Sequence, residues 1–179
     1  LAGDGFVRPG KGNEANRMVD PYDDSQDLTE RVRSYLAVNC ACCHRPAGGA
    51  PSALHFQRPV SPDKWAAIDE KPTQGDFGIT DARLIKPGRP DQSALLYRVA
   101  TSGPGKMPKL GGHEPDLQGA KLLWQWIEQL DESGAARNDS LVSRPADQPF
   151  STDQALAIWH RLTAVPANEA REQATQLVA

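Results

Sequence analysis

Apolar residues recur at helical spacing in three stretches of the chain. The first follows Asp27, which can cap a helix while Glu30 reaches back to the cap residue. The second follows Asp91, and the third begins at Asp116 and runs to about Asp131. Because the third stretch carries a wide apolar stripe, we expect it to pack against the first helix. This stripe consists of Leu117, Ala120, Leu122, Leu123, Trp124, Trp126, Ile127 and Leu130.

The segments between these stretches contain many Gly and Pro residues and predict loops. Residues 62–72 are an exception, because they predict a short helix with Trp65 and Ile68 turned inward. The pattern as a whole predicts an all-α, loop-rich fold.

Four parts can be distinguished along the chain. Residues 1–24 predict an extended arm or linker, residues 25–132 the main domain, and residues 133–150 a polar linker. Residues 151–179 predict a helical extension, with helices near 152–163 and 168–177.

Composition and net charge limit the kinds of partner that we expect for this chain. Only 39% of the 179 residues are hydrophobic, and 15 Gly and 15 Pro are present, so the core is modest. The net charge of −3 argues against a nucleic-acid partner. No apolar run is long enough for a transmembrane segment, and no signal peptide is recognisable at Leu1. We expect a mature form or a piece of a longer protein.

The stretch Cys40-Ala41-Cys42-Cys43-His44 carries the most specific chemistry. Read from Cys40 it is C-x-x-C-H, the pattern of c-type haem attachment. Two thiols at this spacing can add to the two vinyl groups of one haem, and the adjacent imidazole can then ligate the iron. The motif therefore predicts one covalent haem c, attached through Cys40 and Cys43, with His44 as proximal ligand.

A zinc site and a disulfide are the competing interpretations of these cysteines. Structural zinc takes four protein ligands, and the chain has only three Cys with no second C-x-x-C or H-x3-H arm. A disulfide between neighbouring cysteines would leave one thiol over and would not account for His44.

Residues 45–62 turn to Pro, Gly, Ala and Ser and predict a loop. A proximal histidine needs a hydrogen-bond partner for its other ring nitrogen, often a backbone carbonyl, which fixes the tautomer and the ring orientation. Pro51 or a neighbour is well placed in the sequence to supply this carbonyl to His44.

A second axial ligand is predicted after the next turn. Gly103-Pro104-Gly105 cannot stay helical, and Lys106-Met107-Pro108 follows it. The Met107 thioether suits haem iron, and His/Met ligation raises the reduction potential. His113 is the rival ligand, and Met107 could instead fill a gap in the core. Local chemistry favours Met107 without excluding either alternative.

The order of these features resembles a class I c-type cytochrome: helix, C-x-x-C-H, Gly/Pro loop, helix, Met-Pro loop and long helix. Residues 33–40 with Cys43-His44-Arg45-Pro46 more narrowly resemble cytochrome domains fused near the C-terminus of large bacterial proteins. Planctomycete proteins, and some with sugar-dehydrogenase-like propellers, are among them. Residues 87–91 and 96–98 also look like that group, and the resemblance covers about residues 25–131.

The resemblance implies a small cytochrome c-like helical fold wrapped around one covalent haem. It gives Cys40 and Cys43 the thioether bonds, His44 the proximal role and Met107 the distal role. Cys42 departs from the family pattern, which requires no thiol there. It could be an apolar filler, a free thiol near the haem, an alternative attachment point or a partner in an intermolecular disulfide.

One-electron transfer is the expected function, with a redox partner protein or a fused dehydrogenase domain as partner. On this reading the chain performs no catalysis of its own. The alternative is a haem enzyme or ligand sensor with a labile distal site, such as a peroxidase. Because haem is attached to C-x-x-C-H outside the bacterial cytoplasm, the expected location is periplasmic or otherwise extracytoplasmic.

Overall fold

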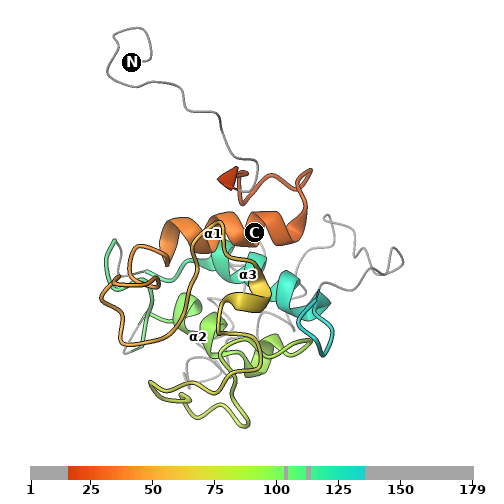
Figure 1. Ribbon diagram of the computed structural model, residues 1–179. Coiled ribbons are helices and arrows are strands. Elements are labelled where there is room, and N and C mark those ends of the chain that lie inside the picture. Colours follow the sequence, from red (N-terminus) through yellow and green to blue (C-terminus); the bar gives the residue numbers. More distant parts are fainter. Residues whose placement is uncertain (1–15, 103–104, 112–113, 136–179) are drawn as a thin grey trace, which may run out of the picture.

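Three α-helices and two 3-10 turns form the regular structure in a computed structural model that describes residues 16–102, 105–111 and 114–135. The α-helices are α1 (Leu28–Asn39), α2 (Ala94–Ala100) and α3 (Leu117–Gln129), and these ranges contain no strand. Helix α1 lies across the structure above α2, with α3 between them and farther from the viewer (Figure 1). The predicted all-α class is therefore confirmed for the described part of the chain.

Helix α1 begins as predicted, with the Asp27 carboxylate accepting a hydrogen bond from the backbone N–H of Glu30 at 3.0 Å. Contrary to the prediction, the Glu30 side chain does not reach back to the cap residue. Glu30 instead pairs with two guanidiniums, Arg33 at 2.7 Å and Arg58. A strong cationic pairing from a distant loop thus competes with the local capping contact.

Helices α1 and α3 pack closely through a tyrosine and a glycine. The ring of Tyr35 lies against Gly119, where an added Cβ would come within 2.2 Å of the tyrosine oxygen. The Tyr35 hydroxyl donates to the carboxylate of Asp116 at 2.8 Å, and the same carboxylate caps α3 by accepting from Gly119 N at 2.8 Å. Residues from all three helices form the core, including Val32, Leu36, Leu96, Val99, Leu123, Trp126 and Ile127.

Helix α2 begins later than predicted. Pro90–Gln92 forms the 3-10 turn η4, and Ser93 rather than Asp91 precedes the helix. Ser93 is held in an extended conformation because it forms an isolated β-bridge with Arg83. Its hydroxyl also donates a hydrogen bond to Arg89 O at 3.0 Å. The proline-initiated turn and this long-range bridge therefore displace the helix start.

The helix predicted over residues 62–72 is wrong except for its first turn. Only Pro62–Lys64 is helical, as the 3-10 turn η3. Ala66 and Asp69 then adopt positive φ values of 54° and 53°, which an α-helix cannot accommodate. Trp65 nevertheless turns inward as predicted, and it is 1% exposed.

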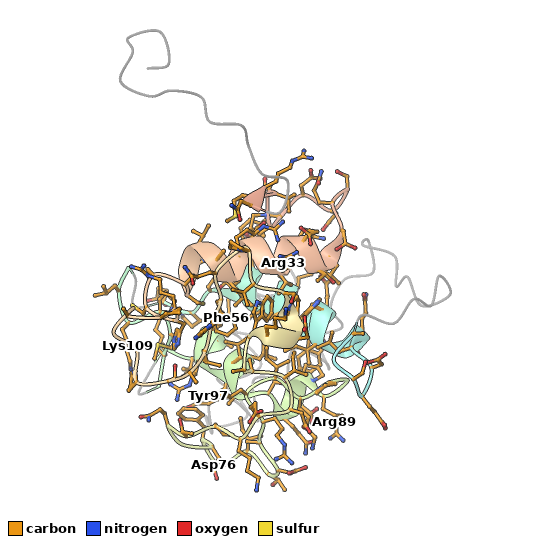
Figure 2. The ribbon with its side chains drawn as sticks, in the orientation of Figure 1. Arg33, Phe56, Asp76, Arg89, Tyr97 and Lys109 are labelled. Carbon is orange, nitrogen blue, oxygen red and sulfur yellow. The ribbon has the colours of Figure 1, made fainter. Side chains whose placement is uncertain are left out.

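Part of the predicted arm lies on α1. Val19 N donates to the Ser34 hydroxyl at 3.0 Å, and Arg31 reaches back to Pro21 O at 2.8 Å and to Asp24 at 2.6 Å. Arg58 adds a hydrogen bond to Arg17 O at 2.6 Å. In Figure 2, Arg33 lies at the middle of α1, on the helix that carries these contacts.

The predicted helices in 152–163 and 168–177 lie outside the described residues. Within the described ranges, none of the helices has the length and apolar character that a membrane span requires.

Candidate functional site

The Cys40–His44 stretch forms a tight turn at the end of α1. Cys40 is the C-terminal cap residue, with its N–H bonded to Leu36 O at 2.9 Å. The amides of Cys43 and His44 both donate back to Cys40 O, at 3.2 and 2.8 Å. The turn therefore brings the first and last positions of the motif together. Because Leu36 is completely buried, the motif is anchored in the core.

Gly48 lets the following loop return past the turn. A Cβ at this position would lie 2.3 Å from the carbonyl oxygen of Cys43, a contact between backbone and side chain that no rotamer could relieve. Ala50 N then donates to the same carbonyl at 3.4 Å. Any larger residue at Gly48 would force the loop away from the motif.

All three cysteines are free thiols. Cys40 is 8% exposed, and burial, followed by the neighbouring Cys42 and Cys43, raises the pKa of its thiol to about 12. Cys42 and Cys43 are exposed, with their sulfurs 3.7 Å apart. The hydrogen bond with Cys42 is the main cause that raises the pKa of Cys43. The raised pKa values keep the thiols of Cys40 and Cys43 protonated at neutral pH.

The imidazole of His44 is oriented by a hydroxyl. Its Nδ1 lies 2.9 Å from Oγ of Ser52, so the observed partner is the side-chain hydroxyl of the residue after Pro51, where a backbone carbonyl of Pro51 or a neighbour was expected. Phe56 packs edge-on against the ring at a centroid distance of 5.8 Å and donates its amide to His44 O at 3.0 Å. With Nδ1 engaged by Ser52, Nε2 is the nitrogen that can bind a metal.

The electrostatic environment keeps His44 neutral. Burial is the main cause that lowers the pKa of His44, and the positive charge of Arg98 lowers it further. A neutral imidazole is the form that ligates iron. Arg98 belongs to α2.

Met107 is placed by the same arginine. Its backbone N–H donates to Arg98 O at 2.7 Å, and its side chain is partly buried. The Arg98 guanidinium donates to Gly105 O at 3.0 Å and to Gln74 O at 2.9 Å. Arg98 therefore fixes the Met107 loop to α2 through both its backbone and its side chain. The rival ligand His113 lies outside the described residues.

The donor set fits a haem better than a bare ion. Nowhere in the described ranges do three His, Cys, Asp or Glu side chains converge on a point where they could hold a metal. Haem brings four nitrogen ligands of its own and needs only axial ligands from the protein. Cys40, Cys43 and His44 would hold it on one side, and Met107 could serve on the other.

No family model, curated protein or solved structure gives a significant match to this chain. The resemblance to class I c-type cytochromes therefore stays a prediction that depends on the motifs described above.

Two residues of the site were missed in the sequence. Ser52 has a local signal, because it follows Pro51 in the loop where a partner for His44 was expected. Arg98 has none, because its proximity to His44 and its contacts with Gln74 and Gly105 depend on how α2 packs.

Proposed function

We propose that this chain is a c-type cytochrome domain that transfers one electron at a time. The observation that carries the proposal is the Cys40–His44 turn, which is fixed to the buried face of α1 at Leu36 and has its imidazole already oriented by Ser52. A bound haem supplies an iron that alternates between the ferric and ferrous states.

The residues of the chain have distinct roles in this proposal. Cys40 and Cys43 hold the haem covalently, and His44 provides the proximal nitrogen through Nε2. Met107 provides the distal sulfur, which raises the reduction potential relative to a second imidazole. Because both ligands are attached to hydrogen-bonded backbone, the iron can change charge with little movement of the protein.

The location and partner belong to the same proposal. The domain works in the periplasm or another extracytoplasmic compartment, where haem is attached to C-x-x-C-H. It exchanges electrons with a redox partner protein or with a dehydrogenase domain fused to it, through a small transient contact.

An optical spectrum of the ferric, haem-loaded protein tests this function. A six-coordinate, low-spin spectrum that does not respond to added cyanide, and a ferrous form that does not respond to CO, is the expected result. A five-coordinate spectrum with rapid ligand binding would instead indicate the haem enzyme or ligand sensor.

A further inference from the structure

Arg98 connects three segments around the candidate site. Its guanidinium donates to Gln74 O in one loop and to Gly105 O in another, and it lies 4.6 Å from the centre of the Phe77 ring. Its own carbonyl accepts the Met107 N–H at 2.7 Å. One residue thus holds the Met107 loop at two points, through its backbone and through its side chain.

Phe77 completes this arrangement. Its ring stacks on Tyr97 at a centroid distance of 4.3 Å and an interplanar angle of 14°. Gly105, at a φ of 97°, lies so close that an added Cβ would be 2.6 Å from Phe77 Cε1. The Met107 loop is therefore packed against Phe77 at Gly105 and bonded to Arg98 at Gly105 and at Met107.

The charge of Arg98 is not balanced by a carboxylate. Across the described ranges its polar partners are backbone carbonyls, and no ion pair involves it. Arginine stays protonated in proteins even when partly buried. Its guanidinium binds Gly105 O, two residues before Met107, so the charge is fixed beside the loop that carries the predicted distal ligand.

We infer that Arg98 is a positioning residue for the Met107 ligand and, through its unbalanced charge, a determinant of the reduction potential. This inference rests on the proposed haem function. Reduction lowers the positive charge at the iron, so a nearby fixed cation favours the ferrous state. The effect is stronger in a partly buried site than in water.

Three variants separate the two effects. Arg98→Gln removes the charge and weakens the hold on the loop, whereas Arg98→Lys keeps the charge but not the forked hydrogen bonding. Gly105→Ala keeps Arg98 but introduces a methyl group that collides with Phe77 at a strained φ. Arg89→Gln is the control, because it makes the same charge change at a side chain that is 54% exposed and paired with Asp91. In Figure 2, Arg89 lies on the opposite side of the structure from Lys109, which follows Met107-Pro108.

The weak red absorption band of an iron–thioether bond reports on positioning. We expect it to be reduced or lost in Arg98→Gln and Gly105→Ala, reduced in Arg98→Lys and unchanged in Arg89→Gln. A full-strength band in all three site variants would overturn the positioning role. If Arg98→Gln does not fold, Arg98→Lys and Gly105→Ala decide this point.

The potential is measured with Met107→Ala added to wild type and to each variant, and with saturating imidazole as the sixth ligand, so that the loop supplies no ligand in any protein compared. Arg98→Gln should then have a lower potential than wild type, while Arg98→Lys and Arg89→Gln should stay near it. Equal potentials for Arg98→Gln and wild type would overturn the electrostatic role. If Arg98→Gln does not fold, Arg98→Met gives the same comparison. A wild-type protein without covalent haem in its denatured mass would refute the proposed function instead.

Discussion

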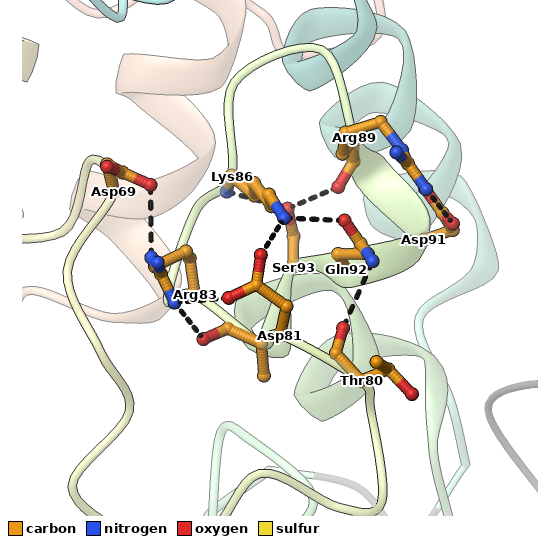
Figure 3. Close-up of polar contacts among 10 residues, drawn as sticks. Asp69, Thr80, Asp81, Arg83, Lys86, Arg89, Asp91, Gln92 and Ser93 are labelled. Carbon is orange, nitrogen blue, oxygen red and sulfur yellow. Dashed lines mark hydrogen bonds and ion pairs between the residues drawn. The ribbon is translucent and has the colours of Figure 1, made fainter.

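Two irregular segments of this protein are each held in place by basic side chains, but these side chains have different kinds of partner. In residues 69–93, Arg83 lies between Asp69 at 3.1 Å and Asp81 at 2.9 Å, and Lys86 pairs with Asp81 at 2.5 Å (Figure 3). At the Met107 loop, the α2 residue Arg98 bonds backbone carbonyls and an aromatic face, and no carboxylate among the described residues. Arg83 and Lys86 are thus paired with carboxylates, whereas Arg98 pairs with no carboxylate in the described ranges and keeps a positive charge beside the Met107 loop.

This difference indicates what each segment does. Charges of opposite sign in contact offset each other, and the exposed aspartates are further screened by solvent, so the ion pairs of residues 69–93 hold the fold and project little field. An unpaired, partly buried cation acts on whatever occupies the neighbouring site. Changes to the ion pairs of Arg83 and Lys86 should therefore alter stability, and changes at Arg98 should alter the haem site.

Met107→Ala should have the largest effect on the haem site. Removal of the thioether opens the distal position and lowers the potential by on the order of 0.1 V or more, within the roughly 0.8 V range that axial ligands control. Haem should remain attached, because Cys40 and Cys43 are untouched. Spectroscopy and redox titration give the answer, and an unchanged spectrum would show that another residue is the ligand.

Ser52→Ala should have a smaller effect of opposite sign. Loss of the acceptor at Nδ1 makes His44 a weaker electron donor, which destabilises the ferric state and raises the potential. Ser133→Ala is the matched control, since that hydroxyl is exposed and bonds Asp131. A potential that does not rise in Ser52→Ala would contradict the orienting role of this hydroxyl.

Asp81→Asn should affect stability and leave the haem spectrum unchanged. The hydrogen bond from Lys86, followed by the charges of Arg83 and Lys86, holds the pKa of Asp81 below its ordinary value of 3.8. A lowered pKa contributes stability above that value, and the contribution is lost as the pH falls through the lowered pKa. The variant should thus melt slightly below wild type at neutral pH, and the difference should vanish in acid. Thermal melts at several pH values measure this.

Asp76→Asn is the control for that experiment, because Asp76 bonds a backbone amide and no cation in the described ranges. A change in the haem spectrum of Asp81→Asn would contradict this distinction, because it would show that the ion pairs of residues 69–93 also act on the haem.

Cys42→Ser should have the smallest effect. The Cys42 thiol is exposed and stands outside the C-x-x-C spacing, so one haem with two thioether links should remain. Mass spectrometry of haem-bearing peptides would detect the loss of a link, and such a loss would mean that the cysteine pairing proposed here is wrong.

The sequence predicts the elements whose signals are local. Helices α1 and α3 begin at Asp27 and Asp116, where a carboxylate caps the first turn, and their apolar faces are buried as expected. The start of α2 and the segment 62–72 were predicted incorrectly, because long-range bridges at Arg83 and Ile68 override local propensity there.

The residues of the candidate site likewise differ in whether a local sequence signal predicts them. Cys40, Cys43 and His44 are identified by their spacing alone, and the turn that joins them is formed by adjacent residues. The partner of His44 Nδ1 is the Ser52 hydroxyl, where a backbone carbonyl of Pro51 or a neighbour was predicted. Arg98 could not be predicted from local pattern, since its role depends on tertiary packing against Gln74, Phe77 and Gly105.

The mass of the denatured protein, after production with a c-type maturation system, tests the central claim most directly. We predict the mass of the chain plus one haem, retained in denaturant and lost in the double variant Cys40→Ala/Cys43→Ala. A wild-type mass equal to that of the polypeptide alone would contradict the claim that Cys40–His44 is a haem attachment site.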